Sequence, residues 1–126
     1  MAAEGHLPAL FAPVPTRGLV ICVGTGITLG ALASHESVAS IDAVDLSESV
    51  LAALPIFDNE NGAAYLDPKV RVVNADGRHV LELSDRRYGL ITVEPPPPIV
   101  PLTMIFGASA TAIDFVSAAS ADLLTV

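Results

Sequence analysis

An apolar run that leads into a glycine turn is the feature that most constrains the fold of this chain. Residues 19–23, Leu-Val-Ile-Cys-Val, are rich in β-branched side chains and predict a buried strand. Gly24 and Gly26 follow, and a helix is expected from Ile27 to about His35. A strand, a tight glycine turn and a helix form the unit with which α/β proteins hold a nucleotide. The glycines let the backbone approach the ligand, and the helix N-terminus presents free N–H groups to it.

The spacing of the glycines separates two classes of nucleotide-binding fold. Gly24, Gly26 and Gly30 give G-x-G-x-x-x-G, whereas the dinucleotide pattern is G-x-G-x-x-G. This spacing favours a fold of the S-adenosylmethionine type over a NAD-binding Rossmann domain. Two alternatives stay open: a NAD domain, which tight NADH binding would support, and a crossover whose glycines serve only packing.

Acidic residues come directly after the predicted strands. The pairs of strand and acid are 38–44 with Asp45, 70–74 with Asp76, and 90–93 with Glu94. Asp45 lies about 20 residues beyond the glycines, where a carboxylate usually grips a ribose. Ligands of open α/β sheets bind outside the carboxyl ends of the strands, so these acids predict a site at that edge.

Strands that alternate with helical stretches predict an α/β fold with a parallel, doubly wound sheet. Ser47 is expected to cap a helix over 48–54 that stops near Pro55. Residues 58–62 are expected to form a loop, and 79–83 a short helical turn. The chain is divided into a loop-like lead-in (1–17), an incomplete nucleoside-binding α/β domain (18–98) and an atypical tail (99–126). The tail is expected to hold a strand near 102–106 and a weak helix over 111–124.

Composition excludes several functions. The net charge is −8, which argues against nucleic-acid binding because that needs a basic footprint. Cys22 is the only cysteine, and its place in a predicted buried strand indicates an inert core thiol. The three histidines are scattered along the chain, and no metal site is expected.

The chain is expected to be cytoplasmic. Residues 18–34 form an uncharged run like a signal peptide, but the run begins late, carries several glycines and leads directly into a predicted strand. The longer uncharged run over 95–113 contains too many prolines to span a membrane as a helix.

Five blocks of the chain resemble, in order and spacing, the spermidine synthase (polyamine aminopropyltransferase) family. They are residues 6–8, 17–26, 43–47, 67–78 and 88–95. The Glu-Pro-Pro-Pro-Pro run at 94–98 is similar to the spermidine synthase-like branch. The resemblance covers about residues 5–98. It implies a partial Rossmann-like fold of the class I S-adenosylmethionine-dependent methyltransferase kind, in a chain that is a fragment.

The resemblance also implies ligands and residue roles. The donor would be decarboxylated S-adenosylmethionine or S-adenosylmethionine itself, the acceptor a polyamine or other amine, and no metal would take part. The cofactor-binding residues would be Gly24, Thr25, Gly26, Asp45, Leu46, Asp76 and Gly77. Asp45 would hold the ribose hydroxyls and Asp76 would face the adenine amino group. Glu94 matches the first acid of the family's Asp-x-x-Asp motif and would be catalytic, orienting the amine and accepting its proton.

Three positions depart from the family pattern. Cys22 stands where the loop has its first glycine, Gly89 where an Asp precedes the fourth strand, and Pro97 where the second catalytic acid belongs. A non-catalytic nucleoside-binding remnant and an S-adenosylmethionine-dependent methyltransferase are therefore the alternative functions. A sheet that stops after its fourth strand has an unpaired edge, which predicts marginal stability or self-association, with a homo-oligomer as one outcome.

Overall fold

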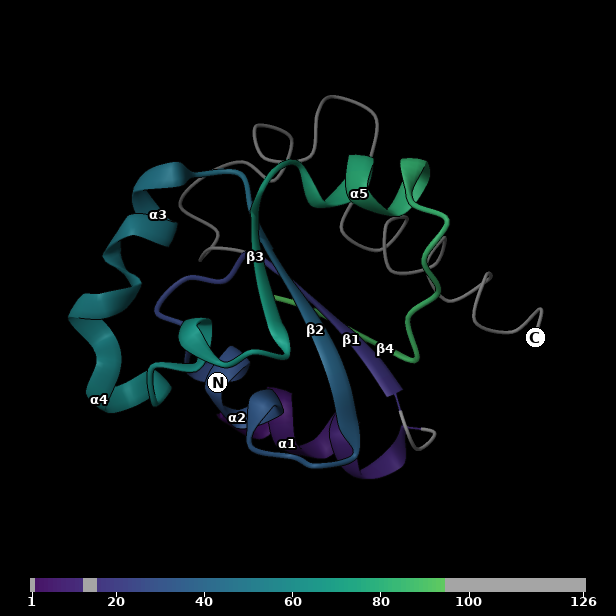
Figure 1. The fold of residues 1–126 in the computed structure, drawn as a ribbon, viewed down its shortest axis with the longest axis horizontal. Helices are drawn as coiled ribbons and strands as arrows, with labels where there is room; N and C mark the ends of the chain where they lie inside the picture. Colours follow the sequence, from purple (N-terminus) through teal and green to yellow (C-terminus); the bar gives the residue numbers. More distant parts are fainter. Residues whose placement is uncertain (1, 13–15, 95–126) are drawn as a thin grey trace.

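The computed structural model describes residues 2–12 and 16–94, and its centre is a four-stranded parallel sheet (Figure 1). The strands are β1 (Thr16–Ile21), β2 (Val38–Asp45), β3 (Val70–Asn74) and β4 (Leu90–Val93). They are arranged in the order β3-β2-β1-β4, so the chain reverses its direction of growth across the sheet after β3. The predicted α/β fold with a parallel, doubly wound sheet is confirmed.

Helices cover both faces of this sheet. They are α1 (Ala2–Phe11), α2 (Ile27–Ala33), α3 (Glu48–Ala53), α4 (Asp58–Asn61) and α5 (Gly77–Leu83), with 3-10 turns at Leu54–Phe57 and Ala64–Leu66. α1 and α2 lie together on one face, and α5 lies on the other (Figure 1). Connections through helices on both faces are what parallel strands require.

Two apolar clusters form the core, one on each face of the sheet. On the α2 face, Val20 and Ile41 pack with Leu29 and Leu32 of α2. On the α5 face, Leu19, Ile21 and Val44 pack with Tyr88, and side chains of α5 cover them. Neighbouring residues of β1 point to opposite faces, so a nearly continuous apolar strand supplies both clusters.

The strand predictions hold closely. β3 and β4 begin and end where the sequence predicts, and β2 extends one residue further, through Asp45. β1 instead runs from Thr16 to Ile21, so Cys22 lies just past its end and is partly exposed rather than inside a buried strand. Cys22 has φ of +62°, a left-handed conformation that ends the extended strand two residues earlier than expected.

The lead-in is helical, and the expectation of a loop there was wrong. α1 contains Pro8, which argues against a helix on local grounds. The helix forms because it docks on α2: a Cβ on Gly5 would come within 2.6 Å of the Thr28 carbonyl oxygen. Tertiary packing of this kind outweighs weak local propensity.

The expected loop over 58–62 was also wrong. Residues Asp58–Asn61 form α4, one helical turn that ends on Gly62 in the left-handed conformation (φ +64°). The predicted cap at Ser47 is confirmed, since its hydroxyl accepts a hydrogen bond from the Val50 N–H at 3.4 Å. α5 begins at Gly77, earlier than the predicted turn over 79–83, because Asp76 caps it.

Several expectations lie outside the described residues: the polyproline run at 95–98, the strand near 102–106 and the helix over 111–124. In the described part of the chain, none of the helices has the length and apolar character needed to cross a membrane.

Candidate functional site

The glycine turn follows β1 and has the backbone geometry that glycine permits. Gly24 and Gly26 have φ of +57° and +82°. A Cβ on Gly24 would meet nothing within 4 Å, so there is open space beside it. A Cβ on Gly26 would come within 2.9 Å of the Leu54 side chain, so this glycine is also needed for packing.

Asp45 ends β2 and ties the glycine turn to the sheet. One carboxylate oxygen accepts a hydrogen bond from the Val23 N–H at 2.9 Å, and the other accepts from the Ser47 N–H at 2.9 Å. The carboxylate is therefore fixed beside the turn by charge-assisted bonds. Each oxygen keeps a further lone pair with which it can accept a ligand hydroxyl.

Asn61 is a residue of this site that the sequence analysis missed. It is 2% exposed, and its amide nitrogen donates to the carbonyls of Thr25 and Leu54, each at 3.0 Å. These two bonds tie the glycine turn at Thr25 to the backbone at Leu54. The hydroxyl of Thr25 is buried and has no hydrogen-bond partner among the described residues. The Asn61-Gly62 dipeptide is a turn signal, but nothing local to it indicates contact with a turn far along the chain.

Asp76 and Gly77 begin α5. The Asp76 carboxylate accepts from the Arg78 N–H at 2.9 Å, so this predicted adenine contact also caps the helix. Gly77 packs closely on β1, because a Cβ there would come within 2.6 Å of the Ile21 side chain. Leu46 is 59% exposed, and its carbonyl accepts from the Asn74 amide at 3.1 Å.

Glu94 follows β4 and lies against two helices of the α2 face. Its N–H donates to the Ile21 carbonyl, and its carboxyl group accepts a hydrogen bond from the Thr28 hydroxyl. Burial raises the pKa of Glu94 to about 7, and a hydrogen bond with Glu4 of α1 adds to the rise. Thr28 and Glu4 were not predicted as site residues, because their proximity to Glu94 exists only after α1 and α2 dock.

The predicted acids come together at the carboxyl edge of the sheet, around Cys22. Burial raises the pKa of the Cys22 thiol to about 11. The negative charges of Asp45, Glu94 and Asp76 add to the rise, in decreasing order of effect. Contacts place the acids at this edge: the Asp45 carboxylate accepts from the Val23 N–H, and the Glu94 N–H donates to the Ile21 carbonyl. Asp76 precedes Gly77, which packs on the same Ile21. Carboxylates gathered at this edge can accept hydrogen bonds from the hydroxyl and amino groups of a ligand.

Comparison with known sequences gives the same family throughout. The spermine/spermidine synthase domain matches residues 3–114, further than the expected end of the resemblance near residue 98. A polyamine aminopropyltransferase of Thermococcus onnurineus is 31% identical over 101 residues, which cover 80% of this chain and 36% of the relative. One of Methanocaldococcus jannaschii is 30% identical over 101 residues, covering 80% of this chain and 34% of the relative.

Solved structures have the same fold. A spermidine synthase in complex with the transition state analogue AdoDATO superposes with a TM-score of 0.68 at 23% identity, covering 76% of this chain and 33% of that one. The spermidine synthase of Thermotoga maritima gives 0.65 at 23% identity, covering 71% and 32%. The chain thus spans about a third of the length of these relatives. By its sequence over most of its length and by its fold, this chain belongs to the spermine/spermidine synthase domain family.

Proposed function

We propose that this chain binds the nucleoside part of decarboxylated S-adenosylmethionine or S-adenosylmethionine and contributes to aminopropyl transfer onto a polyamine or other amine. The observation that carries the proposal is the position of Asp45, Asp76 and Glu94 at the edge of the sheet that holds the glycine turn, in a member of this family. The relatives it matches are named as aminopropyltransferases, and the neighbour with AdoDATO is named as a spermidine synthase.

The described residues fit the nucleoside half of such a donor. The open space beside Gly24 leaves room for a ligand to lie against the backbone. The Asp45 carboxylate is held at the end of β2, where it can accept hydrogen bonds from ribose hydroxyls. The carboxylate of Asp76 would accept from the adenine amino group while it caps α5. Leu46 and Thr25 would line the same stretch.

The reaction needs an amine that is neutral when it attacks. The amine nitrogen forms a bond to the carbon next to the sulfonium, the carbon–sulfur bond breaks, and sulfur keeps the electron pair as a thioether. The attacking nitrogen must lose one proton, and the Glu94 carboxylate would orient the amine and accept that proton. With a pKa of about 7, Glu94 is close to the value at which a general base is most effective near neutral pH.

The first test is calorimetric titration of the chain with methylthioadenosine. Binding is expected in the parent chain, and Asp45→Ala is expected to weaken it about tenfold or more, because a charged hydrogen-bond acceptor is lost. Asp85→Asn, an exposed acid at the other edge of the sheet, is the matched control and is expected to bind normally. A folded parent chain that does not bind methylthioadenosine contradicts the proposal.

A second test separates transfer from binding. Incubation with decarboxylated S-adenosylmethionine and putrescine is expected to release methylthioadenosine, and Glu94→Gln is expected to abolish the release while binding persists. Methyl transfer from S-adenosylmethionine would support the methyltransferase alternative. Nucleoside binding without either transfer would show the non-catalytic remnant.

A further inference from the structure

The amino-terminal edge of the sheet, opposite the candidate site, has an open groove of about 650 Å³. It lies where β1, β2 and β4 begin and is lined by Arg17, Arg86 and Arg87 together with Asp85 and Ser40. The chain has a net charge of −8 and only 6 Lys and Arg residues, so the concentration of arginines at one groove is a pronounced local reversal of charge.

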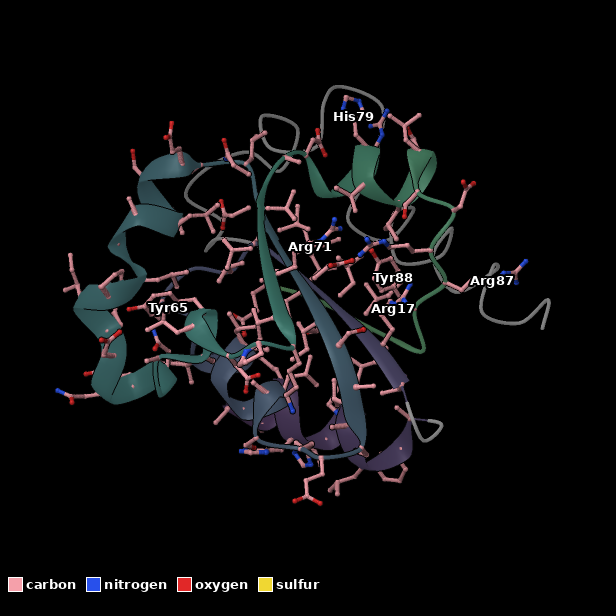
Figure 2. The ribbon with its side chains drawn as sticks, in the orientation of Figure 1. Arg17, Tyr65, Arg71, His79, Arg87 and Tyr88 are labelled. Carbon is pink, nitrogen blue, oxygen red and sulfur yellow. The ribbon has the colours of Figure 1, made fainter. Side chains whose placement is uncertain are left out.

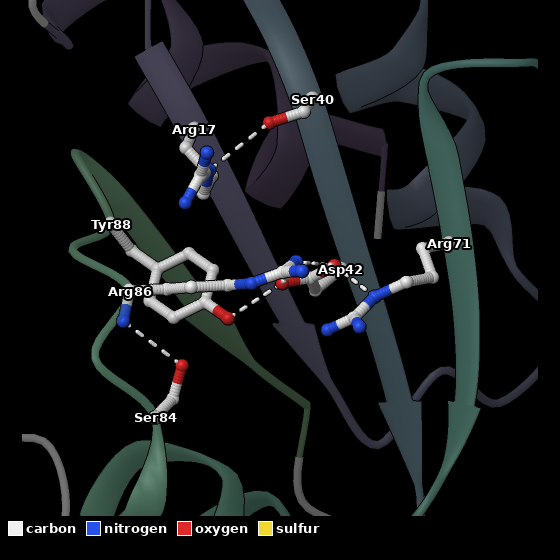
Figure 3. A network of polar contacts seen from close by, with 7 residues as sticks. All are labelled: Arg17, Ser40, Asp42, Arg71, Ser84, Arg86 and Tyr88. Carbon is white, nitrogen blue, oxygen red and sulfur yellow. Dashed lines mark hydrogen bonds and ion pairs between the residues drawn. The ribbon is translucent and has the colours of Figure 1, made fainter.

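A buried carboxylate beneath the groove holds part of this cluster in place. Asp42 is 3% exposed and projects from β2 toward the α5 face. Its oxygens accept from Arg86 Nη1 at 3.1 and 3.2 Å, from Arg71 Nε at 2.8 Å and from the Tyr88 hydroxyl at 2.6 Å (Figure 3). These bonds fix the direction of two guanidinium groups. Arg86 uses only one terminal nitrogen in them.

The other arginines keep most of their donors. Arg17 donates through Nε to the Ser40 hydroxyl at 3.3 Å, and this is its one side-chain bond among the described residues (Figure 3). Arg87 has no ion-pair partner in the described part of the chain, and its side chain points outward from the segment before β4 (Figure 2). The three arginines of the groove and Arg71, which pairs with Asp42, supply four positive charges. Asp42 and Asp85 offset two of them, so two positive charges remain in excess.

We propose that this groove, defined by Arg17, Arg86 and Arg87, binds a small molecule that carries a phosphate group. Guanidinium groups match phosphate oxygens through paired N–H donors. One phosphate carries close to two negative charges at neutral pH, which equals the excess, whereas one carboxylate carries a single charge. The volume lies within the range of small-molecule sites. The bonds of Arg86 to Asp42 and of Arg17 to Ser40 orient two of the three guanidinium groups before the ligand arrives.

The test is calorimetric titration of the chain with inorganic pyrophosphate at low salt. The double variant Arg17→Gln/Arg87→Gln is expected to weaken binding about tenfold or more, because two charge-assisted contacts are lost. Both residues are exposed, and neither touches Asp42, so the fold is expected to persist. The control Lys69→Gln/Arg78→Gln makes the same change in net charge away from the groove and is expected to bind within about twofold.

Three outcomes would overturn this assignment: no pyrophosphate binding by the parent chain, equal losses in both double variants, or tighter binding of citrate than of pyrophosphate. The melting temperature of each variant checks that it is folded. Methylthioadenosine binding is expected to be unchanged in the arginine double variant, so a failure at this groove is distinguishable from a failure of the proposed function.

Discussion

Asp42 shows how one buried charge is tolerated in an apolar sheet. Burial opposes its ionisation, but hydrogen bonds from Arg71, Tyr88 and Arg86 outweigh this penalty and lower its pKa below the usual value. Its partners come from β3 and from the segment before β4, so the carboxylate joins three parts of the chain. Removing one member of such a cluster leaves the others without compensation.

Asp42→Asn is expected to lower the free energy of unfolding at pH 7 by about 2 kcal/mol, less than for a fully buried pair because both arginines are half-exposed. Since the folded pKa is lowered, the contribution of Asp42 is present above its unfolded pKa and is lost as pH falls through the folded value. Urea unfolding between pH 3 and pH 7 measures this. The same acid-induced loss in the parent chain and in Asp42→Asn would contradict the role of this carboxylate.

Cys22 has a left-handed backbone that costs a residue with a side chain about 1–2 kcal/mol. Cys22→Gly removes this cost but adds chain entropy to the unfolded state, so a net gain in stability of about 0.5 kcal/mol is expected. Cys22→Ala keeps the strain and loses the thiol packing, so it is expected to destabilise. Thermal unfolding of both variants separates the two effects, and a Cys22→Gly variant less stable than Cys22→Ala would show that no strain is present.

The raised pKa of Cys22, about 11, makes its thiol unreactive. At pH 8 the folded chain is expected to react with iodoacetamide about a hundredfold more slowly than the unfolded chain in urea, because little thiolate is present. The rate is expected to rise with pH toward 11. Equal rates for the folded and unfolded chain would contradict the shift.

At the scale of the elements, α1 completes the surroundings of Glu94. Gly5 brings α1 against α2, and the adjacent Glu4 reaches the Glu94 carboxyl, which Thr28 of α2 also contacts. The same close approach stabilises a helix that its own sequence does not favour. The helix α1 and the surroundings of Glu94 therefore both depend on the packing of α1 against α2.

Gly5→Ala tests that contact. A Cβ would come within 2.6 Å of a backbone oxygen and 2.8 Å of the Ala31 Cβ, and this overpacking is expected to cost about 2 kcal/mol in urea unfolding. In an isolated helix the same change would stabilise by about 1 kcal/mol. A gain in stability would therefore show that α1 is not packed on α2.

For the whole molecule, the edges of the sheet decide its behaviour in solution. Within the described residues β3 and β4 are the outer strands, and Val72 on β3 is 36% exposed. Unpaired strand edges with apolar side chains favour pairing with another chain. We therefore expect concentration-dependent self-association.

Light scattering after gel filtration measures the self-association. Val72→Lys, which puts a charge on an edge strand, is expected to reduce the associated fraction. Asn59→Lys, at an exposed position of α4, adds the same single charge and is the control. A parent chain that stays monomeric at about 100 μM, well above weak-association affinities, would contradict the expectation.

The sequence by itself determined the strands, the glycine turn and the acids that follow the strands. Apolar runs of β-branched residues and the glycine signal are local, and parallel connection forces the carboxyl ends of strands to one edge. Asp45, Asp76 and Glu94 were predictable for this reason. Their assigned contacts with a donor stay predictions.

Only the tertiary structure decided the helix α1, the support that Asn61 gives to the glycine turn, and the arginine cluster over Asp42. Each depends on contacts between residues far apart in the chain: Gly5 with Thr28, Asn61 with Thr25, Asp42 with Arg86. No local periodicity encodes such contacts, because close approach and charge pairing arise only when elements pack. The sequence therefore fixes where a site can form, and packing decides which side chains complete it.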